Sequence, residues 1–148
     1  MKVSIGCDHG GFLLKDHLKA YLIKTGREVI DHGCYDNGRV DYPDYALKVS
    51  KDVQNKEADY GLLVCTTGIG MSITANKVKG VRAALVTNLE AAQLTREHND
   101  SNVICLGEKF TTLEDGEKYL ETFLTSEFTF GRHTNRVEKI KEVERNEK

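Results

Sequence analysis

The chain has 148 residues, of which 30% are charged and 39% hydrophobic, and its formal net charge is −2 at pH 7. This length fits one domain with its own core, and the balanced charge excludes the basic surface expected of nucleic-acid-binding or membrane-surface proteins. No run approaches the ~18 apolar residues of a transmembrane helix, and the start lacks the apolar segment of a secretory signal, so we expect a cytoplasmic protein with a small-molecule partner.

One unit recurs along the chain: an apolar run rich in β-branched residues, a turn, and a stretch with helical spacing. The apolar runs lie at residues 3–7, 27–32, 61–65, 81–86 and 102–107. Connections of this length suit right-handed crossovers between parallel strands. We therefore predict an α/β fold: a single doubly wound (Rossmann-like) five-stranded parallel sheet, with helices on both faces and a C-terminal helix.

Two segments stand outside this repeat. Residues 34–43, with Asn37-Gly38 and the only proline, form one long loop that is able to close over a ligand. From Arg132 onward the chain is highly charged, with Val137 and Ile140 as a thin apolar stripe. We interpret this part as a terminal helix docked on another surface, with residues from about 138 to 148 as a partly frayed tail of the single domain 1–148.

Ligands of such folds bind at the carboxyl ends of the strands, which directs attention to Asp8, His9 and the turn that begins at Cys65. A strand, a turn and a helix in that order aim backbone N–H groups and a helix dipole into the turn, which favours an anionic ligand and a thiolate. Gly68 and Gly70 allow close approach of the backbone to a ligand. The alternatives are that Asp8 caps a turn, that His9 and His98 are structural, and that Cys65 only packs.

Several familiar motifs are excluded at this turn. A cysteine phosphatase would need an arginine where the chain has Met71, and a thioredoxin-type pair would need a cysteine at Gly68. The third glycine of a dinucleotide fingerprint and the lysine of a phosphate-binding P-loop are both missing. The four cysteines form no C-x-x-C pair, which favours buried thiols over a disulfide framework or a zinc site.

Arg132 and Arg136 are spaced so that they share one face of a helix. Two guanidinium groups on one face suit a phosphate dianion. The alternative is a solvated face on which they pair with Glu138.

Together these segments resemble the type B ribose-5-phosphate isomerases, a family that also contains galactose-6-phosphate isomerase subunits and allose-6-phosphate isomerases. The resemblance runs in order from Met1 to about Ile140. It is carried by Gly-Cys-Asp-His-Gly-Gly from Gly6, Asp41-Tyr42-Pro43, the Cys-x-Thr-Gly-Ile-Gly turn from Cys65 with Ala75-Asn76-Lys77, Arg96-Glu97-His98-Asn99, and Gly131-Arg132-His133.

The resemblance implies an aldose–ketose isomerase of the pentose phosphate pathway, without metal or cofactor, that interconverts D-ribose 5-phosphate and D-ribulose 5-phosphate through an enediol. By analogy, Cys65 moves a proton between the first two sugar carbons and His98 is the acid that helps to open the furanose ring. It further implies a homodimer, or a dimer of dimers, with shared active sites. The residues implied to bind substrate are Asp8, His9, Tyr42, Thr66, Thr67, Gly68, Ile69, Gly70 and Asn99 at the sugar, and Lys109, Arg132 and Arg136 at the phosphate.

Two departures from the family pattern concern substrate choice. Thr66 stands where the family usually has glycine, and Lys109 where an arginine is common, which keeps the charge but loses the planar fork. The alternatives are therefore an isomerase of allose 6-phosphate or galactose 6-phosphate, a non-catalytic sugar-phosphate sensor, and a thiol hydrolase. Retention of both Arg132 and Arg136 favours a pentose or allose phosphate, and Cys65 argues for catalysis because a sensor needs no base.

Overall fold

Five short strands pair in parallel into one sheet in the computed structural model, which describes residues 1–147. The strands are β1 (Lys2–Cys7), β2 (Glu28–Asp31), β3 (Tyr60–Cys65), β4 (Ala83–Leu85) and β5 (Val103–Gly107), in the order β2-β1-β3-β5-β4. The predicted five-stranded parallel sheet is therefore confirmed. The apolar run at 81–86 forms a shorter strand than its length suggests, and its end residues Val81 and Val86 are buried outside β4.

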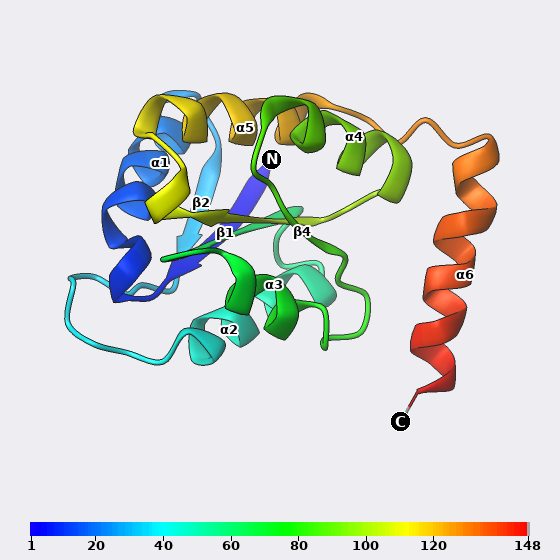
Figure 1. The fold of residues 1–148 in the computed structure, drawn as a ribbon, viewed down its shortest axis with the longest axis horizontal. Helices are drawn as coiled ribbons and strands as arrows, with labels where there is room; N and C mark the ends of the chain where they lie inside the picture. Colours follow the sequence, from blue (N-terminus) through cyan, green and yellow to red (C-terminus); the bar gives the residue numbers. More distant parts are fainter. Residues whose placement is uncertain (148) are drawn as a thin grey trace.

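Helices cover both faces of the sheet (Figure 1), as predicted. One face carries α1 (Phe12–Lys24), α4 (Leu89–Asn99) and α5 (Leu113–Thr125), and the other carries α2 (Tyr42–Gln54) and α3 (Ile69–Ala75). Short 3₁₀ turns at His9–Gly11 and Glu108–Phe110 follow β1 and β5. Two helices begin at a side-chain cap: before α4, Asn88 accepts a hydrogen bond from the Ala91 N–H, and before α5, Thr112 accepts one from the Asp115 N–H.

The core lies on both sides of the sheet because alternate side chains of each strand point to opposite faces. On β3, Leu62 and Val64 pack beneath α1 and α5, whereas Leu63 and Cys65 face α2 and α3. The central strands are consequently apolar on both faces, as expected for a parallel sheet covered by two helical layers. Cys65 therefore ends a strand that is held from both sides.

The last helix, α6 (Arg132–Asn146), lies at the periphery of the molecule beside α4 (Figure 1), and its Glu144 accepts a hydrogen bond from the Gly80 N–H. The segment expected to be partly frayed is helical as far as Asn146. Val137 is the one buried residue of α6, whereas Ile140 and Val143 are 47% and 63% exposed. Most of its apolar stripe is thus left uncovered by its own chain. Among the helices formed by residues 1–147, none has the length and apolar character of a membrane span.

Candidate active site

A cavity of about 420 Å³ opens at the carboxyl edge of the sheet, where β1 and β3 end side by side. Its walls come from the turn after β3, the residue after β1 and the first residue of α2. This is the place where parallel α/β sheets bind ligands. The lining residues are Asp8, Tyr42, Cys65, Thr66, Thr67, Ile69, Gly70 and Ile73, and all of them except Ile73 were predicted as site residues.

Cys65 lies at the base of this cavity and is 5% exposed. Its Sγ accepts a hydrogen bond from the Gly68 N–H at 3.1 Å. Gly68 has φ +78°, and a Cβ there would lie 2.8 Å from the Leu106 carbonyl carbon, so only glycine fits this turn. The turn thus places a backbone donor on the sulfur, where it would stabilise negative charge on a thiolate.

Gly70 and Tyr42 form one wall of the cavity. A Cβ at Gly70 would lie 2.5 Å from Cζ of the Tyr42 ring, so the ring packs directly on the glycine backbone. Tyr42 is the first residue of α2, which Pro43 helps to start because its fixed φ suits the first turn. The long loop 34–41 therefore leads directly into Tyr42, which lines the cavity.

Asp8 and His9, the two residues after β1, each accept a hydrogen bond from a backbone N–H, and Asp8 lines the cavity with Cys65. Asp8 Oδ1 accepts a hydrogen bond from the Gly10 N–H at 2.9 Å, so Asp8 caps a turn and lines the cavity at the same time. His9 Nδ1 accepts one from the Val40 N–H at 3.2 Å. A neutral ring in this arrangement carries its proton on Nε2, which leaves a donor for a ligand. The contact also ties the loop 34–41 to the 3₁₀ turn that follows β1.

Thr66 and Lys109 connect the ends of β3 and β5. The Lys109 N–H donates to the Thr66 carbonyl at 3.0 Å, and the Lys109 side chain is exposed at this edge. The Thr66 side chain packs against Gly10, where an added Cβ would lie 3.2 Å from the Thr66 Cβ. The branched side chain therefore occupies space between the two loops that form the cavity.

The other predicted site residues do not join this cavity within one chain. α4 runs back from the carboxyl edge to the start of β5, so His98 and Asn99 lie at the amino edge. Arg82, which directly precedes β4, donates from Nε to the Asn99 carbonyl at 3.1 Å. A strand rises about 3.3 Å per residue, so the six-residue β3 separates Cys65 from that edge by roughly 15–20 Å.

His98 instead belongs to a cationic cluster with the start of α6. Its ring stacks on that of His133, with centroids 4.2 Å apart and an interplanar angle of 13°. The pKa of His133 is lowered, first by desolvation and then by the nearby charges of His98, Arg132 and Arg136. Two guanidinium groups beside two imidazoles form a site suited to an anion.

His133 was missed as a candidate site residue, although it stood in the Gly131-Arg132-His133 motif. The signal available in the sequence was a histidine between two arginines that share a helix face. Over residues 1–147, no group of three or more His, Cys, Asp or Glu side chains is arranged to hold a metal ion.

The chain is similar to known sugar-phosphate isomerases over nearly its whole length. Residues 3–140 match the family described as Ribose/Galactose Isomerase. Ribose-5-phosphate isomerase B of Escherichia coli is 43% identical over 143 residues, which cover 97% of this chain and 96% of that protein. The structure of Clostridium thermocellum ribose-5-phosphate isomerase B has a TM-score of 0.96 at 49% identity, with 98% of each chain covered. That of the Mycoplasma genitalium isomerase B with bound ribulose-5-phosphate has a TM-score of 0.94 at 39% identity, covering 99% of this chain and 97% of that one.

Proposed function

Because this chain belongs to the ribose/galactose isomerase family, we propose that it is an aldose–ketose isomerase that interconverts D-ribose 5-phosphate and D-ribulose 5-phosphate without a cofactor. The observation that carries the proposal is Cys65, whose Sγ lies in the cavity and accepts the Gly68 N–H. Similarity to ribose-5-phosphate isomerases over nearly the whole chain supports this choice of sugar phosphate.

The chemistry follows from the two groups of residues. His98 donates a proton to the ring oxygen of the furanose as the bond between C1 and that oxygen breaks, and the C1 hydroxyl releases its proton to water as the C1=O bond forms, which produces the open aldehyde. The Cys65 thiolate then removes the proton from C2, and the electron pair forms the enediolate while O1 takes up negative charge. Backbone N–H groups of the turn 66–70 stabilise that charge. Return of the proton to C1, with a proton moving from O2 to O1, yields the ketose.

We propose further that a second copy of the chain completes each site. Within one chain, Cys65 and His98 lie at opposite edges of the sheet, farther apart than one pentose reaches. The uncovered Ile140 and Val143 on α6 offer an apolar surface for such a partner. In this arrangement, the cavity of one protomer receives the cationic cluster of the other, with Arg132 and Arg136 at the phosphate.

A direct test is to incubate the purified protein with ribose 5-phosphate in deuterated water, without added metal or nucleotide. We expect ribulose 5-phosphate to form, with deuterium entering at the carbon that receives the proton. Parallel reactions with allose 6-phosphate and galactose 6-phosphate measure the substrate preference. A protein that binds these sugar phosphates but turns none of them over would be a sensor, and the proposal would be wrong.

The role of Cys65 is tested by Cys65→Ala, with Cys105→Ala as the matched control. Cys105 is a buried thiol of β5 next to Cys65, but it does not line the cavity. Loss of a positioned base lowers the rate by about a hundred- to ten-thousandfold, so Cys65→Ala should be nearly inactive while Cys105→Ala keeps its activity. Near-normal turnover by a folded Cys65→Ala protein would contradict the assignment.

A further inference from the structure

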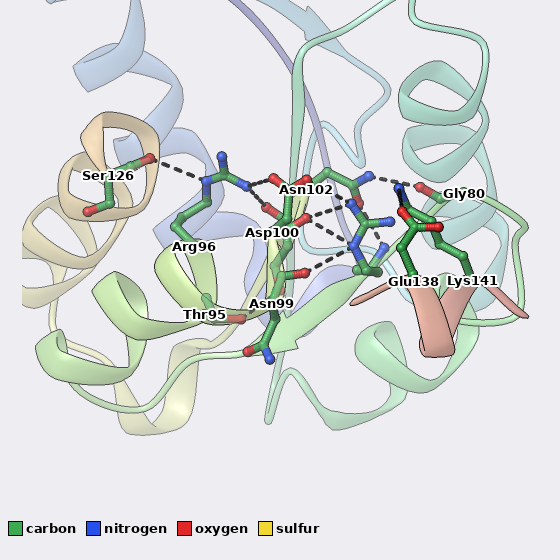
Figure 2. A network of polar contacts seen from close by, with 11 residues as sticks. Gly80, Thr95, Arg96, Asn99, Asp100, Asn102, Ser126, Glu138 and Lys141 are labelled. Atoms are coloured by element: carbon green, nitrogen blue, oxygen red, sulfur yellow. Dashed lines mark hydrogen bonds and ion pairs between the residues drawn. The ribbon is translucent and has the colours of Figure 1, made fainter. Parts of the chain in front are cut away.

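We propose that Arg82 is a positioning residue for this isomerisation, because it holds the end of α4 and thereby His98 and Asn99. Its guanidinium donates hydrogen bonds to the carbonyls of Asn99 and Asp100, two labelled residues of the polar network in Figure 2. The inference rests on the proposed function, in which His98 opens the sugar ring, and on the family resemblance, which implies that Asn99 binds the sugar.

The end of α4 requires hydrogen-bond donors from outside the helix. The last four carbonyls of an α-helix have no partner within the helix. Thr129 supplies two donors to the Glu97 carbonyl, from N–H at 3.1 Å and Oγ1 at 2.9 Å. Arg82 Nε donates to the Asn99 carbonyl at 3.1 Å, and a cation at a helix C-terminus also complements the helix dipole. His98 lies between these two anchored carbonyls.

The same guanidinium also holds the residue that ends the helix. Arg82 Nε and Nη2 donate to the Asp100 carbonyl at 3.1 and 2.8 Å, and Nη2 is 3.3 Å from Asp100 Oδ2. Asp100 has φ +48°, a left-handed conformation that is unfavourable for a residue with a side chain. The contacts of Arg82 therefore hold Asp100 in a backbone conformation that Asp100 does not favour by itself.

Arg82 is itself fixed in place. Its N–H donates to Asn102 Oδ1 at 2.8 Å, and Asn102 Nδ2 donates to the Gly80 carbonyl at 2.8 Å (Figure 2). The Arg82 side chain is 16% exposed, and from the other side Arg96 Nη1 holds Asp100 Oδ1 at 2.9 Å. A planar fork of this kind reaches several oxygens at once, which the single ammonium of a lysine does not.

Loss of the Arg82 contacts should affect one step of the reaction more than the other. Beyond the helix backbone, the His98 ring is oriented by its stacking on His133. A general acid must stay within hydrogen-bond reach of the atom it protonates, and displacement by about 1 Å lowers the rate up to about a hundredfold. Loss of the Arg82 fork should therefore affect ring opening more than proton transfer at Cys65.

The experiment compares Arg82→Lys with Arg27→Lys. Arg27 is a matched control because it also forms a forked ion pair, to Glu121 at 2.7 and 3.0 Å, but does not contact the end of α4. We expect kcat on ribose 5-phosphate to fall about ten- to a hundredfold in Arg82→Lys alone. Exchange of the C1 hydrogen of ribulose 5-phosphate with deuterated water should stay unchanged, because this ketose, phosphorylated at O5, has no furanose ring to open. An equal fall in both rates would overturn the proposal.

A double-variant cycle tests whether Arg82 acts through His98. Adding Arg82→Lys to His98→Ala should cause no further loss on ribose 5-phosphate, whereas a full additional loss would show that Arg82 acts independently and would refute the proposal. If Arg82→Lys folds poorly, Asn102→Ala, which frees the Arg82 backbone, should reproduce the selective loss. The absence of that loss in folded Asn102→Ala would also refute the proposal.

A readout without turnover separates this inference from the proposed function. The histidine ring signals of His98 in NMR spectra should shift in Arg82→Lys and stay in place in Arg27→Lys. Wild-type protein that fails to isomerise ribose 5-phosphate would refute the proposed function. Unchanged His98 signals in folded Arg82→Lys would instead refute the positioning role, whatever the substrate.

Discussion

Mixing two impaired variants should raise activity above that of either parent if each site combines Cys65 of one chain with Arg136 of its partner. Cys65 ends β3 at the carboxyl edge, whereas Arg136 lies one helical turn after His133, which stacks on His98 at the amino edge. A hybrid dimer of Cys65→Ala and Arg136→Ala chains then has one site with both defects and one intact site. Random mixing makes half of the dimers hybrid, so about one quarter of all sites regain wild-type activity.

The assay is to unfold and co-refold the two variants, to confirm hybrids by native mass spectrometry, and to measure isomerisation of ribose 5-phosphate. The matched control pairs Cys65→Ala with Asp8→Ala. Both of these residues line the same cavity of one chain, so every site of their hybrid keeps one defect and no activity should return. Confirmed Cys65→Ala and Arg136→Ala hybrids with no gain over either parent would show that the two residues do not meet across the interface.

Two further predictions concern the phosphate site and stability. Arg136→Ala removes a charge-assisted contact worth roughly 1.5–3 kcal/mol, so kcat/KM on ribose 5-phosphate should fall about ten- to a hundredfold. Inhibition by inorganic phosphate should weaken as well. An equal loss on free ribose would show that Arg136 has a structural role instead. Burial alone would raise the pKa of Asp31, but hydrogen bonds from Lys19 and the Gly33 N–H, with the charge of Lys15, lower it below its ordinary 3.8. The stability from Asp31 is therefore present above about pH 4 and is lost as the pH falls through the lowered pKa. Asp31→Asn leaves the buried Lys15 without its charged partner, so urea unfolding at pH 7 should give a free energy of unfolding about 3–5 kcal/mol lower than that of the wild type. A difference between the two proteins that stays constant down to pH 2 would contradict this account.

The strands and the cysteine turn were accessible from the sequence because their signals are local. Buried parallel strands read as continuous apolar runs, and each of the five runs overlaps an observed strand. The residues after β1 and β3 meet because neighbouring parallel strands end at the same edge. The predicted grouping of Asp8, Cys65 and Gly70 in one cavity therefore followed from the order of the elements.

Less local features were harder to predict. Spacing placed Arg132 and Arg136 on one helix face, but it does not show that His133 stacks on His98, because that contact joins two helices about 35 residues apart in the chain. Arg82 carried no motif at all. Its role depends on three backbone and side-chain oxygens that come together only when α4 returns to the start of β5.

The sequence by itself therefore determined the parallel α/β architecture, the cysteine turn and the types of side chain available for chemistry. These follow from hydrophobic periodicity and from glycine positions, which act over a few residues. Only the tertiary structure decided that these side chains divide between two edges of one sheet, with Cys65 at one edge and His98 at the other. The physical reason is that the direction of a crossover helix, and the donors that hold its end, arise from packing between segments far apart in the chain.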